Sequence, residues 1–304
     1  MVFVMKKIRS FFIALFLLGM ALVVAAVVFN LDVFLRLSNA YKAGTLSEQK
    51  IRYEIAAYNL NNWERVTPIQ KKISPKDGMV QVYVPEGEFE MGKPGKPDGN
   101  SPEHKVYLDA YWIDRVEVSN AMYEVCVESG KCTQPFLEEN PYYGRWAYRN
   151  LPVTFISWFQ AVEYCEWTGR RLPTEAEWEK AARGTDGRNY PWGDTPPTPR
   201  LANYAESLIG EPVSVYRYPS GASPYGALNM AGNVREWLAD WFSLTYYVET
   251  PYKNPLGPET GIQRSMRSGA YDADANEIYT TWRYKHEPQS AGLSRGFRCA
   301  ESAR

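Results

Sequence analysis

The sequence predicts an α+β fold with little regular secondary structure, preceded by a single transmembrane helix. From about residue 78 onward, short strand-like and helix-like segments alternate with long loops, and no repeat of 20–50 residues is evident. Glycine (22), proline (21) and aromatic residues (10 Trp, 22 Tyr, 12 Phe) are abundant. This composition suits a compact, loop-rich fold held together by aromatic packing. The transmembrane helix is predicted from an apolar run near the N-terminus.

The apolar run spans residues 11–29 and follows three basic residues, Lys6, Lys7 and Arg9. About 20 apolar residues can cross a bilayer as a helix, and preceding positive charge favours a cytoplasmic N-terminus. We therefore expect residues 1–10 in the cytoplasm, residues 11–29 in the membrane as a signal anchor, and the rest outside, in a periplasm or on the cell surface. The alternative is a cleaved signal peptide, but the run is long for one and no convincing small-x-small cleavage site precedes Asn30.

Residues 30–77 are polar with helix-friendly pieces, and we interpret them as a stalk or linker; a partner-binding helix is the alternative. The outer domain, residues 78–304, begins with strand-like segments. Alternating apolar residues predict a strand over 80–84, a strand and turn over 87–92, and a further strand over 107–114.

Two helices follow, each with a capping residue at its start. Ser119 caps the first, which buries four side chains and ends before Gly130; they are Met122, Tyr123, Cys126 and Val127. Ser157 and Gln160 have the spacing of a capping box and open the second, which Gly169 ends. Its buried side carries Ala161, Tyr164 and Cys165.

The most sharply delimited helix is predicted between Thr174 and Gly184. Thr174 and Glu177 have the capping-box spacing, and glycine commonly ends a helix. Acidic residues crowd the first turns and basic residues the last, which suits the helix dipole; they are Glu175, Glu177, Glu179, Lys180 and Arg183. Trp178, Ala181 and Ala182 share one face, which we expect to be the packing face.

The charge balance and the histidine content exclude some functions. With 34 Lys and Arg against 35 Asp and Glu, nothing indicates a nucleic-acid partner. The chain has two histidines, His104 and His286, which disfavours a metal site built from several histidines.

Six ordered blocks carry a family resemblance: Met79–Gly92, Val116–Asn120, Leu151–Gly184, Tyr190–Asp194, Tyr225–Trp237 and Arg295–Cys299. Together they closely resemble the sulfatase-modifying factor family, the formylglycine-generating-enzyme-like domain, over residues 78–301. The resemblance implies a single domain of the C-type-lectin-like type, irregular and packed by aromatic residues.

Four cysteines follow the apolar run, an even number in a compartment expected to be oxidising. Cys126 and Cys132 flank Gly130 closely enough for a small disulfide loop. Cys165 and Cys299 stand where the family places a structural disulfide, so the resemblance implies that pair. The alternative is four buried free thiols.

Active family members oxidise a cysteine of a sulfatase to formylglycine, using two cysteines that bind one copper ion. The resemblance places those cysteines two and seven residues after the aromatic residue of an Arg-Gly-Gly-Ser-Trp/Tyr block. Here the block is Arg267–Tyr271, and the two positions hold Ala273 and Ile278, while Ala270 replaces the active-site serine. Alkyl groups cannot bind copper in place of thiolates. The resemblance therefore implies a chain without copper and without copper-dependent oxidation.

A calcium site of the family is better preserved. Glu236 and the backbone carbonyls of Ala231, Gly232 and Val234 match one set of ligands, and oxygen ligands suit Ca²⁺. The alternative is a tight turn in which Glu236 only hydrogen-bonds neighbouring amides. A second, less complete set begins with Asn203 and the carbonyl of Tyr204, but the later Asp-x-Phe segment of the family is missing.

Other metal sites have weaker support. Asp272, Asp274 and Glu277 cluster where the copper site would lie and could hold a hard cation, although such carboxylates are usually solvated. His104 and His286 are isolated in the sequence. Iron-dependent relatives carry a separate helical domain, and nothing similar precedes residue 78.

The leading functional hypothesis is a membrane-anchored, extracytoplasmic binding module that has lost the copper site. An aromatic groove near Trp237, Tyr271 and Trp282 would hold a peptide, a glycan or a protein partner. One alternative is an oxidoreductase of the same family with a different metal or substrate. Another is a structural piece of a cell-envelope complex, with the stalk making the contacts.

Overall fold

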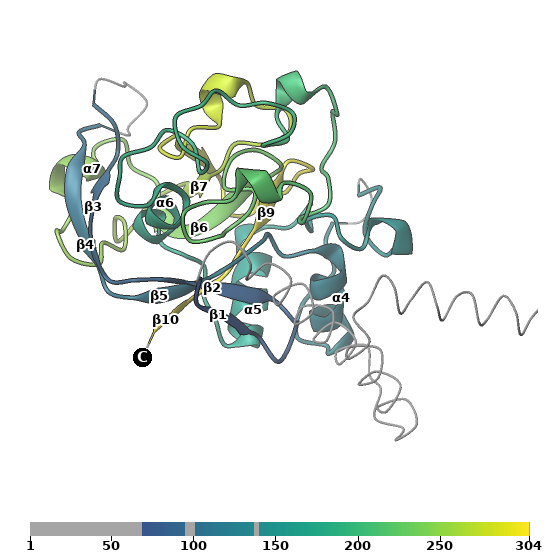
Figure 1. The fold of residues 1–304 in the computed structure, drawn as a ribbon. Coiled ribbons are helices and arrows are strands. Elements are labelled where there is room, and N and C mark those ends of the chain that lie inside the picture. Colours follow the sequence, from purple (N-terminus) through teal and green to yellow (C-terminus); the bar gives the residue numbers. More distant parts are fainter. Residues whose placement is uncertain (1–68, 95–100, 137–139, 304) are drawn as a thin grey trace, which may run out of the picture. The chain divides into compact units, whose positions relative to one another are not determined.

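The computed structural model describes residues 69–94, 101–136 and 140–303. The apolar run 11–29 and most of the expected linker lie outside these ranges. None of the helices within the ranges has the length and apolar character that a membrane crossing requires. Ten strands run through the described part of the chain (Figure 1): β1 Lys71–Ile73, β2 Val80–Val84, β3 Gly87–Met91, β4 His104–Leu108, β5 Tyr111–Asp114, β6 Arg235–Trp241, β7 Arg264–Arg267, β8 Tyr284–His286, β9 Arg295–Phe297 and β10 Ala300–Ser302.

The helices are short and lie between the strands in sequence. Four are α-helical: α4 Asn120–Glu128, α5 Trp158–Thr168, α6 Glu175–Arg183 and α7 Tyr246–Glu249. Four are single 3₁₀ turns: η1 Trp146–Tyr148, η2 Ala205–Ser207, η3 Pro219–Gly221 and η4 Ala275–Glu277. Mixed short elements with long connections confirm the predicted α+β class and its low content of regular structure.

The first sheet has the strand order β1-β2-β5-β10 and joins the start of the domain to its end. β1 pairs with β2, although Lys71–Ile73 falls in the segment that we interpreted as linker. Asp77, also in that segment, is buried, pairs with Arg170 and accepts a hydrogen bond from the Tyr164 hydroxyl at 2.7 Å. The folded domain therefore begins before the expected boundary at residue 78, because these residues complete its sheet and core.

The single strand predicted over 107–114 is two strands in two sheets. β4 pairs with β3, which places Leu108 opposite Gly87. β5 pairs with β2, which places Tyr111 opposite Val84. The chain crosses between the sheets at Asp109 and Ala110, and alternating hydrophobicity alone cannot locate such a crossing because both strands keep the two-residue period.

The third sheet, with the order β8-β7-β6-β9, carries the C-terminal half of the domain. β6 is antiparallel to β7 and parallel to β9. The parallel pair sets Arg235 opposite Arg295, Glu236 opposite Gly296 and Trp237 opposite Phe297. Two segments far apart in the sequence are thereby brought into register, and this register positions the candidate site.

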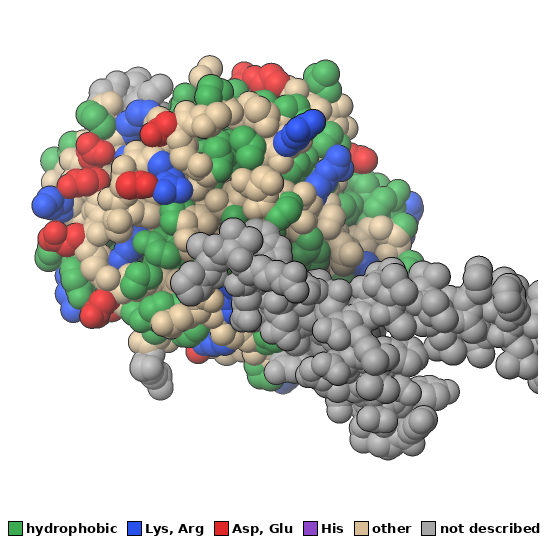
Figure 2. Space-filling model, viewed as in Figure 1, with side chains coloured by type: hydrophobic (Ala, Val, Ile, Leu, Met, Phe, Trp, Pro, Cys, Tyr) green, Lys and Arg blue, Asp and Glu red, His purple; other side chains and the backbone are tan. Residues whose placement is uncertain are grey.

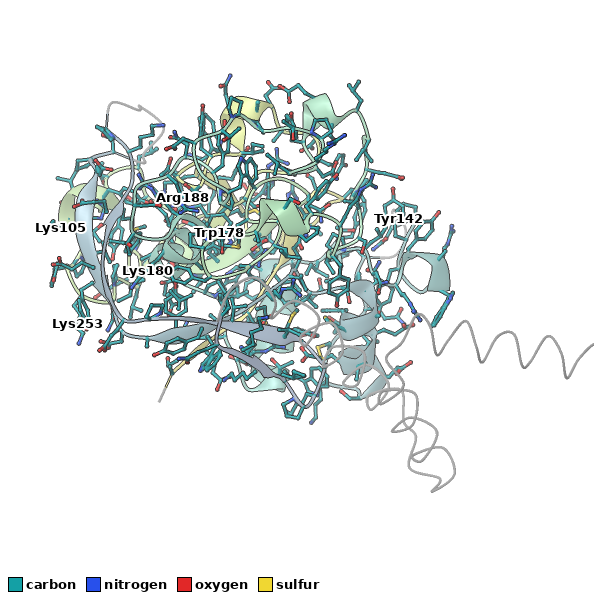
Figure 3. The ribbon with its side chains drawn as sticks, in the orientation of Figure 1. Lys105, Tyr142, Trp178, Lys180, Arg188 and Lys253 are labelled. Carbon is teal, nitrogen blue, oxygen red and sulfur yellow. A yellow bond between two sulfur atoms is a disulfide. The ribbon has the colours of Figure 1, made fainter. Side chains whose placement is uncertain are left out.

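α6 is the helix predicted between Thr174 and Gly184, and its capping box is formed. Glu177 N–H donates to the Thr174 hydroxyl at 3.2 Å, and Thr174 N–H donates to the Glu177 carboxylate at 2.8 Å. The predicted packing face is buried, and so is the rest of the helix, because all nine residues are buried. Figure 3 labels Trp178 and Lys180 of this helix, and both side chains lie within the body of the described domain.

The charged side chains of α6 are stabilised inside the domain by ion pairs and backbone acceptors. Glu175 pairs with Arg267 at 3.0 Å and with Arg283 at 2.6 Å, and Glu179 pairs with Arg267 at 2.7 Å. Lys180 donates to two backbone carbonyls, those of Pro85 and Gly87, at 2.8 Å each. Buried charges need such partners, and these contacts allow the charged side of α6 to be buried.

The other two predicted helices also begin at their expected caps. Ser119 caps α4, and Ser157 forms a capping box with Gln160 at the start of α5. Gly169 ends α5 in the left-handed conformation, at φ +82°. On α4, Met122, Tyr123 and Cys126 are buried as predicted, whereas Val127 is only half-buried.

Both expected disulfides are present. Cys126 and Cys132, which are six positions apart in the sequence, form a disulfide at the end of α4, with Cα atoms 5.3 Å apart. Cys165 on α5 is bonded to Cys299, 134 positions later, with Cα atoms 5.7 Å apart. The second bond ties α5 to the segment between β9 and β10. The sequence contains four cysteines, so no thiol remains free.

Charges of both signs are scattered over the described surface. On the face shown in Figure 2, Lys and Arg side chains are interspersed with Asp and Glu and with hydrophobic groups, without a continuous stripe of one sign. The local groups around each charge, rather than a broad field, therefore decide what this surface can bind.

Candidate functional site

Ala270, Ala273 and Ile278, the positions that the resemblance assigns to the family's serine and copper-binding cysteines, are fully buried. Ala273 and Ile278 belong to one apolar cluster, together with Tyr190 and Tyr204. The cluster continues into stacked rings: Tyr190 lies 5.1 Å from Trp192 and 4.9 Å from Tyr279, between ring centroids. Apolar side chains and stacked rings therefore surround Ala273 and Ile278.

The donor set at this position does not fit copper. Soft thiolates are the ligands that Cu(I) prefers, and the two side chains present are a methyl and a sec-butyl group. No cysteine can be recruited from elsewhere, because all four form disulfides. The chain therefore offers no thiolate ligands with which a copper ion could be held at this position.

Glu236, the carboxylate expected to bind calcium, is fully buried and already holds other partners. Arg298 donates to its two oxygens at 2.6 and 2.7 Å, and Trp178 Nε1–H donates at 2.7 Å. A calcium ion at the same oxygens would lie beside a buried guanidinium, which opposes its charge. The alternative of a tight turn with bonds to neighbouring amides does not describe Glu236 either, because the residue lies in β6 and its partners are side chains about 60 positions away in the sequence. Calcium at Glu236 stays a prediction for direct measurement.

Three of the other expected calcium ligands, Gly232, Asn203 and Tyr204, also have hydrogen-bond partners. The Gly232 carbonyl accepts a hydrogen bond from the Ser268 hydroxyl at 3.0 Å. Asn203 donates to the Glu211 carbonyl at 2.9 Å, and its side-chain oxygen accepts from the Ser207 hydroxyl at 3.0 Å. The Tyr204 carbonyl accepts from the same hydroxyl at 2.7 Å. Ala231 and Val234 are buried beside them.

Trp237 does not line a groove, and that prediction is wrong. Its side chain is fully buried, and its Nε1–H donates to the Ile156 carbonyl at 3.2 Å. Trp237 lies inside β6, between β7 and β9, so its ring packs into the core. The sequence marks the residue as a large aromatic group but does not say which side of the strand meets solvent.

Tyr271 and Trp282, the other two groove candidates, are half-buried at the surface. They belong to a connected set that we call the tyrosine–arginine face: Arg235, Tyr271, Asp272, Trp282, Tyr284 and Arg295. Trp282 and Tyr284 have ring centroids 6.3 Å apart, and the Arg235 guanidinium lies 4.5 Å from the Tyr284 ring centroid. Arg235 pairs with Asp272 at 2.8 Å, and Asp272 follows Tyr271 directly.

The electrostatics of this face are mixed. Burial and the Asp272 carboxylate raise the pKa of Tyr271, whereas Arg235 opposes that shift. Burial also raises the pKa of Tyr284. Burial, with Arg295 and Arg235 nearby, lowers the pKa of His286, and Glu287 acts in the opposite direction. The tyrosines therefore stay neutral at ordinary pH, and the face offers cationic and aromatic groups rather than a nucleophile.

A hard-metal site at Asp272, Asp274 and Glu277 is not assembled. Within the described ranges, no three His, Cys, Asp or Glu side chains converge as a metal site would require. Asp272 pairs with Arg235 instead. His104 Nδ1 contacts the Pro102 carbonyl at 2.9 Å, and His286 contacts Arg295.

Sequence reasoning did not assign a role to Arg235, Tyr284 or Arg295. Arg235 and Arg295 stand within the blocks that carry the family resemblance, but no short-range sequence pattern indicates that the two lie together. They meet only through the parallel register of β6 and β9.

Comparisons with known proteins agree with the geometry. Residues 67–303 match the family described as "Sulfatase-modifying factor enzyme 1-like domain". A formylglycine-generating enzyme of Streptomyces coelicolor is 36% identical over 293 residues, covering 75% of this chain and 91% of that protein. A formylglycine-generating enzyme of Mus musculus is 32% identical over 276 residues, covering 72% of this chain and 74% of that protein.

A solved structure shares the fold. The structure of PvdO from Pseudomonas aeruginosa superposes with a TM-score of 0.68 at 23% identity, covering 78% of this chain and 99% of that one. At that identity the likeness concerns the arrangement of the chain and not its activity.

Proposed function

The chain belongs to the sulfatase-modifying factor enzyme 1-like family, and on that premise we propose that it is a member without copper-dependent oxidase activity that acts as a binding module. The observation that carries the proposal is the apolar cluster around Ala273 and Ile278. Formylglycine formation in the family needs a thiolate pair at these positions. This chain keeps the framework of the domain but has no free thiol to supply the pair.

The proposed location is extracytoplasmic, with residues 11–29 as the membrane anchor. Two disulfides support it, because disulfides persist in oxidising compartments. The tyrosine–arginine face supports a binding role, since exposed edges of aromatic rings and arginine side chains are common in recognition surfaces. Its partner would be a peptide, a glycan or a protein.

The test of lost oxidase activity uses the purified full-length chain, copper and a Cys-x-Pro-x-Arg peptide. We expect no stoichiometric copper binding and no formylglycine by mass spectrometry. The matched variant restores the missing groups through Ala270→Ser, Ala273→Cys and Ile278→Cys, and we expect it to bind copper after reduction. Copper binding and formylglycine formation by the unaltered chain would overturn the proposal.

An oxidoreductase with a different metal is the second candidate, because the named relatives are formylglycine-generating enzymes. Elemental analysis of chain purified from its native host separates the two, by reporting copper, iron and calcium together. A stoichiometric transition metal that is lost on Asp272→Asn or Asp274→Asn would favour this candidate. A metal-free protein that still captures its partner would exclude it.

A structural role for the linker is a further alternative and has its own test. Because β1 belongs to the domain, the deletion must stop before it, at residues 30–67. We expect partner capture to survive this deletion if the domain binds. Loss of capture with an unchanged domain would assign the contacts to the linker.

A further inference from the structure

Arg235 and Arg295 stand side by side on neighbouring strands. β6 and β9 are parallel, and these two residues are partners in register. Neighbouring strands lie about 4.8 Å apart, and partners in register point to the same side of the sheet. Both arginines are half-buried, with 18% of the Arg235 side chain exposed. Two cations are thus held close together and partly out of water.

The two arginines have less negative charge around them than they carry. Arg235 contacts one carboxylate, that of Asp272, whose side chain is 46% exposed. Arg295 contacts the Ser290 hydroxyl at 2.7 Å, the Ala291 carbonyl at 2.9 Å and His286 Nε2 at 2.7 Å. Within the described ranges no carboxylate pairs with Arg295, so the pair has a surplus positive charge.

His286 cannot accept from both of the donors that face it. Glu287 N–H points at its Nδ1 at 3.1 Å, and the Arg295 Nη2 group points at its Nε2. A neutral imidazole has one nitrogen that accepts and one that donates. Either the Glu287 N–H or the Arg295 Nη2–H therefore lacks an acceptor at the ring. If the ring were protonated, both of its nitrogens would donate and neither N–H group would have an acceptor there.

Donor capacity remains on both guanidinium groups. A guanidinium carries five N–H groups. Among the described residues, Arg235 donates to Asp272 and Ser294 through Nη1 and also bonds the Tyr284 side chain, which leaves part of this capacity unused. Arg295 Nε–H has no hydrogen-bond acceptor in the part of the chain that the structure describes. Arginine forks bind carboxylate, sulfate and phosphate oxygens through paired N–H groups.

From this juxtaposition we propose that Arg235 and Arg295 together bind one oxyanion, a phosphate, sulfate or carboxylate group of the ligand. The inference deepens the binding role proposed above, and it rests on that role. Oxygen atoms placed between the two arginines would accept hydrogen bonds from the unused N–H groups and compensate the surplus charge. They would also give the Arg295 Nε–H group an acceptor. The half-buried rings of Trp282 and Tyr284 flank this position and would contact the part of the ligand that carries the anion.

The two histidines make the test specific. Full-length protein labelled at histidine Cε1 gives one NMR signal from His286, beside the anion position, and one from His104, which serves as the reference. Sodium phosphate, sodium sulfate and sodium acetate are titrated separately, at constant ionic strength kept with sodium chloride. We expect the His286 signal to shift and saturate while the His104 signal stays in place. The probe that saturates at the lowest concentration identifies the kind of oxyanion.

Variants separate binding from general charge effects. We expect Arg235→Gln and Arg295→Gln to weaken binding at least tenfold. Arg295→Lys keeps the charge without the fork, and it should weaken binding several-fold. Arg200→Gln removes an equal charge from an exposed position outside the tyrosine–arginine face and should bind like the unaltered chain. Thermal unfolding checks that each variant is folded, and Arg295→Lys replaces Arg295→Gln if the latter is not.

Two results would overturn the inference. One is the absence of a saturable His286 shift with phosphate, sulfate and acetate alike. The other is equal binding by folded Arg235 and Arg295 variants. Neither bears on oxidase activity, which the copper and peptide assay reports separately, so failure of this inference and failure of the proposed function are distinguishable.

Discussion

At the scale of single residues, Glu236 illustrates how burial decides the role of a carboxylate. Its oxygens accept from Arg298 and Trp178, and all three side chains are fully buried. Glu117 lies nearby, and burial raises its pKa to about 7. The charge of Glu236 is thus neutralised by the chain itself, and the residue joins β6 to the segment after β9.

Replacing Glu236 by Gln is expected to destabilise the fold by about 3–5 kcal/mol, because it leaves the Arg298 guanidinium buried without its counter-charge. Chemical denaturation followed by fluorescence measures the change. The control is Glu301→Gln, which removes a surface pair with Lys72 and should cost about 1 kcal/mol or less. A chelator that lowered the melting temperature of the unaltered chain but not of the Glu236 variant would instead support calcium binding.

His286 is expected to titrate below its ordinary range, because burial and the neighbouring arginines lower its pKa. A depressed histidine pKa means that the folded chain binds fewer protons than the unfolded chain. The contribution to stability is therefore complete above about pH 6.5 and is lost as the pH falls through the lowered pKa. NMR titration of His286 measures its pKa in the folded chain. Arg295→Gln should raise this pKa, because it removes the neighbouring guanidinium. An unaltered His286 pKa in this variant would contradict the assigned contact.

At the scale of elements, α6 shows local and tertiary forces acting together. Its capping box and its terminal charges are set by residues within the helix. Its complete burial is set by Arg267 and Arg283, which pair with its glutamates from later segments. The caps decide where the helix begins and ends, and the arginines allow its polar side to be buried.

Thr174→Ala is expected to cost about 1 kcal/mol, because the Glu177 amide loses its acceptor at the start of the helix. Thr195→Ala, at an exposed loop position, is the matched control and should change stability little. Urea unfolding of both variants gives the comparison. Equal effects of the two substitutions would show that the cap contributes nothing measurable.

Elements with local signals could be predicted from the sequence. The starts of α4, α5 and α6 follow from Ser119, Ser157 and Thr174, each of which accepts a hydrogen bond from its own helix. β1 was missed because three residues of mixed character show no period, and only pairing with β2 defines the strand. The division between β4 and β5 was missed for the related reason that sheet membership is not a local property.

At the scale of the whole molecule, the two disulfides constrain very different lengths of chain. Cys126–Cys132 closes a short loop, whereas Cys165–Cys299 connects α5 to the end of the domain. In the chain-entropy view, a longer closed loop removes more freedom from the unfolded chain. The long bond therefore stabilises the domain as a whole.

Removing the long disulfide by Cys165→Ala and Cys299→Ala is expected to cost about 5 kcal/mol, against about 2 kcal/mol for Cys126→Ala and Cys132→Ala. Thermal and urea unfolding of the two double variants measure this difference, with the short-loop variant as the control. A larger loss for the short loop would show that local packing around α4 outweighs the entropy of the closed chain.

The sequence by itself determined the family, the capped helices and the absence of thiolates at Ala273 and Ile278. These follow from residue identity and short spacing, whereas the pairing of Cys165 with Cys299 was implied by the resemblance and is formed in the structure. Only the tertiary structure decided that Ala273 and Ile278 share one apolar cluster, that Trp237 is buried, and that Arg235 and Arg295 stand together. The physical reason is that strand register and burial depend on contacts between distant segments, which packing of the whole domain selects.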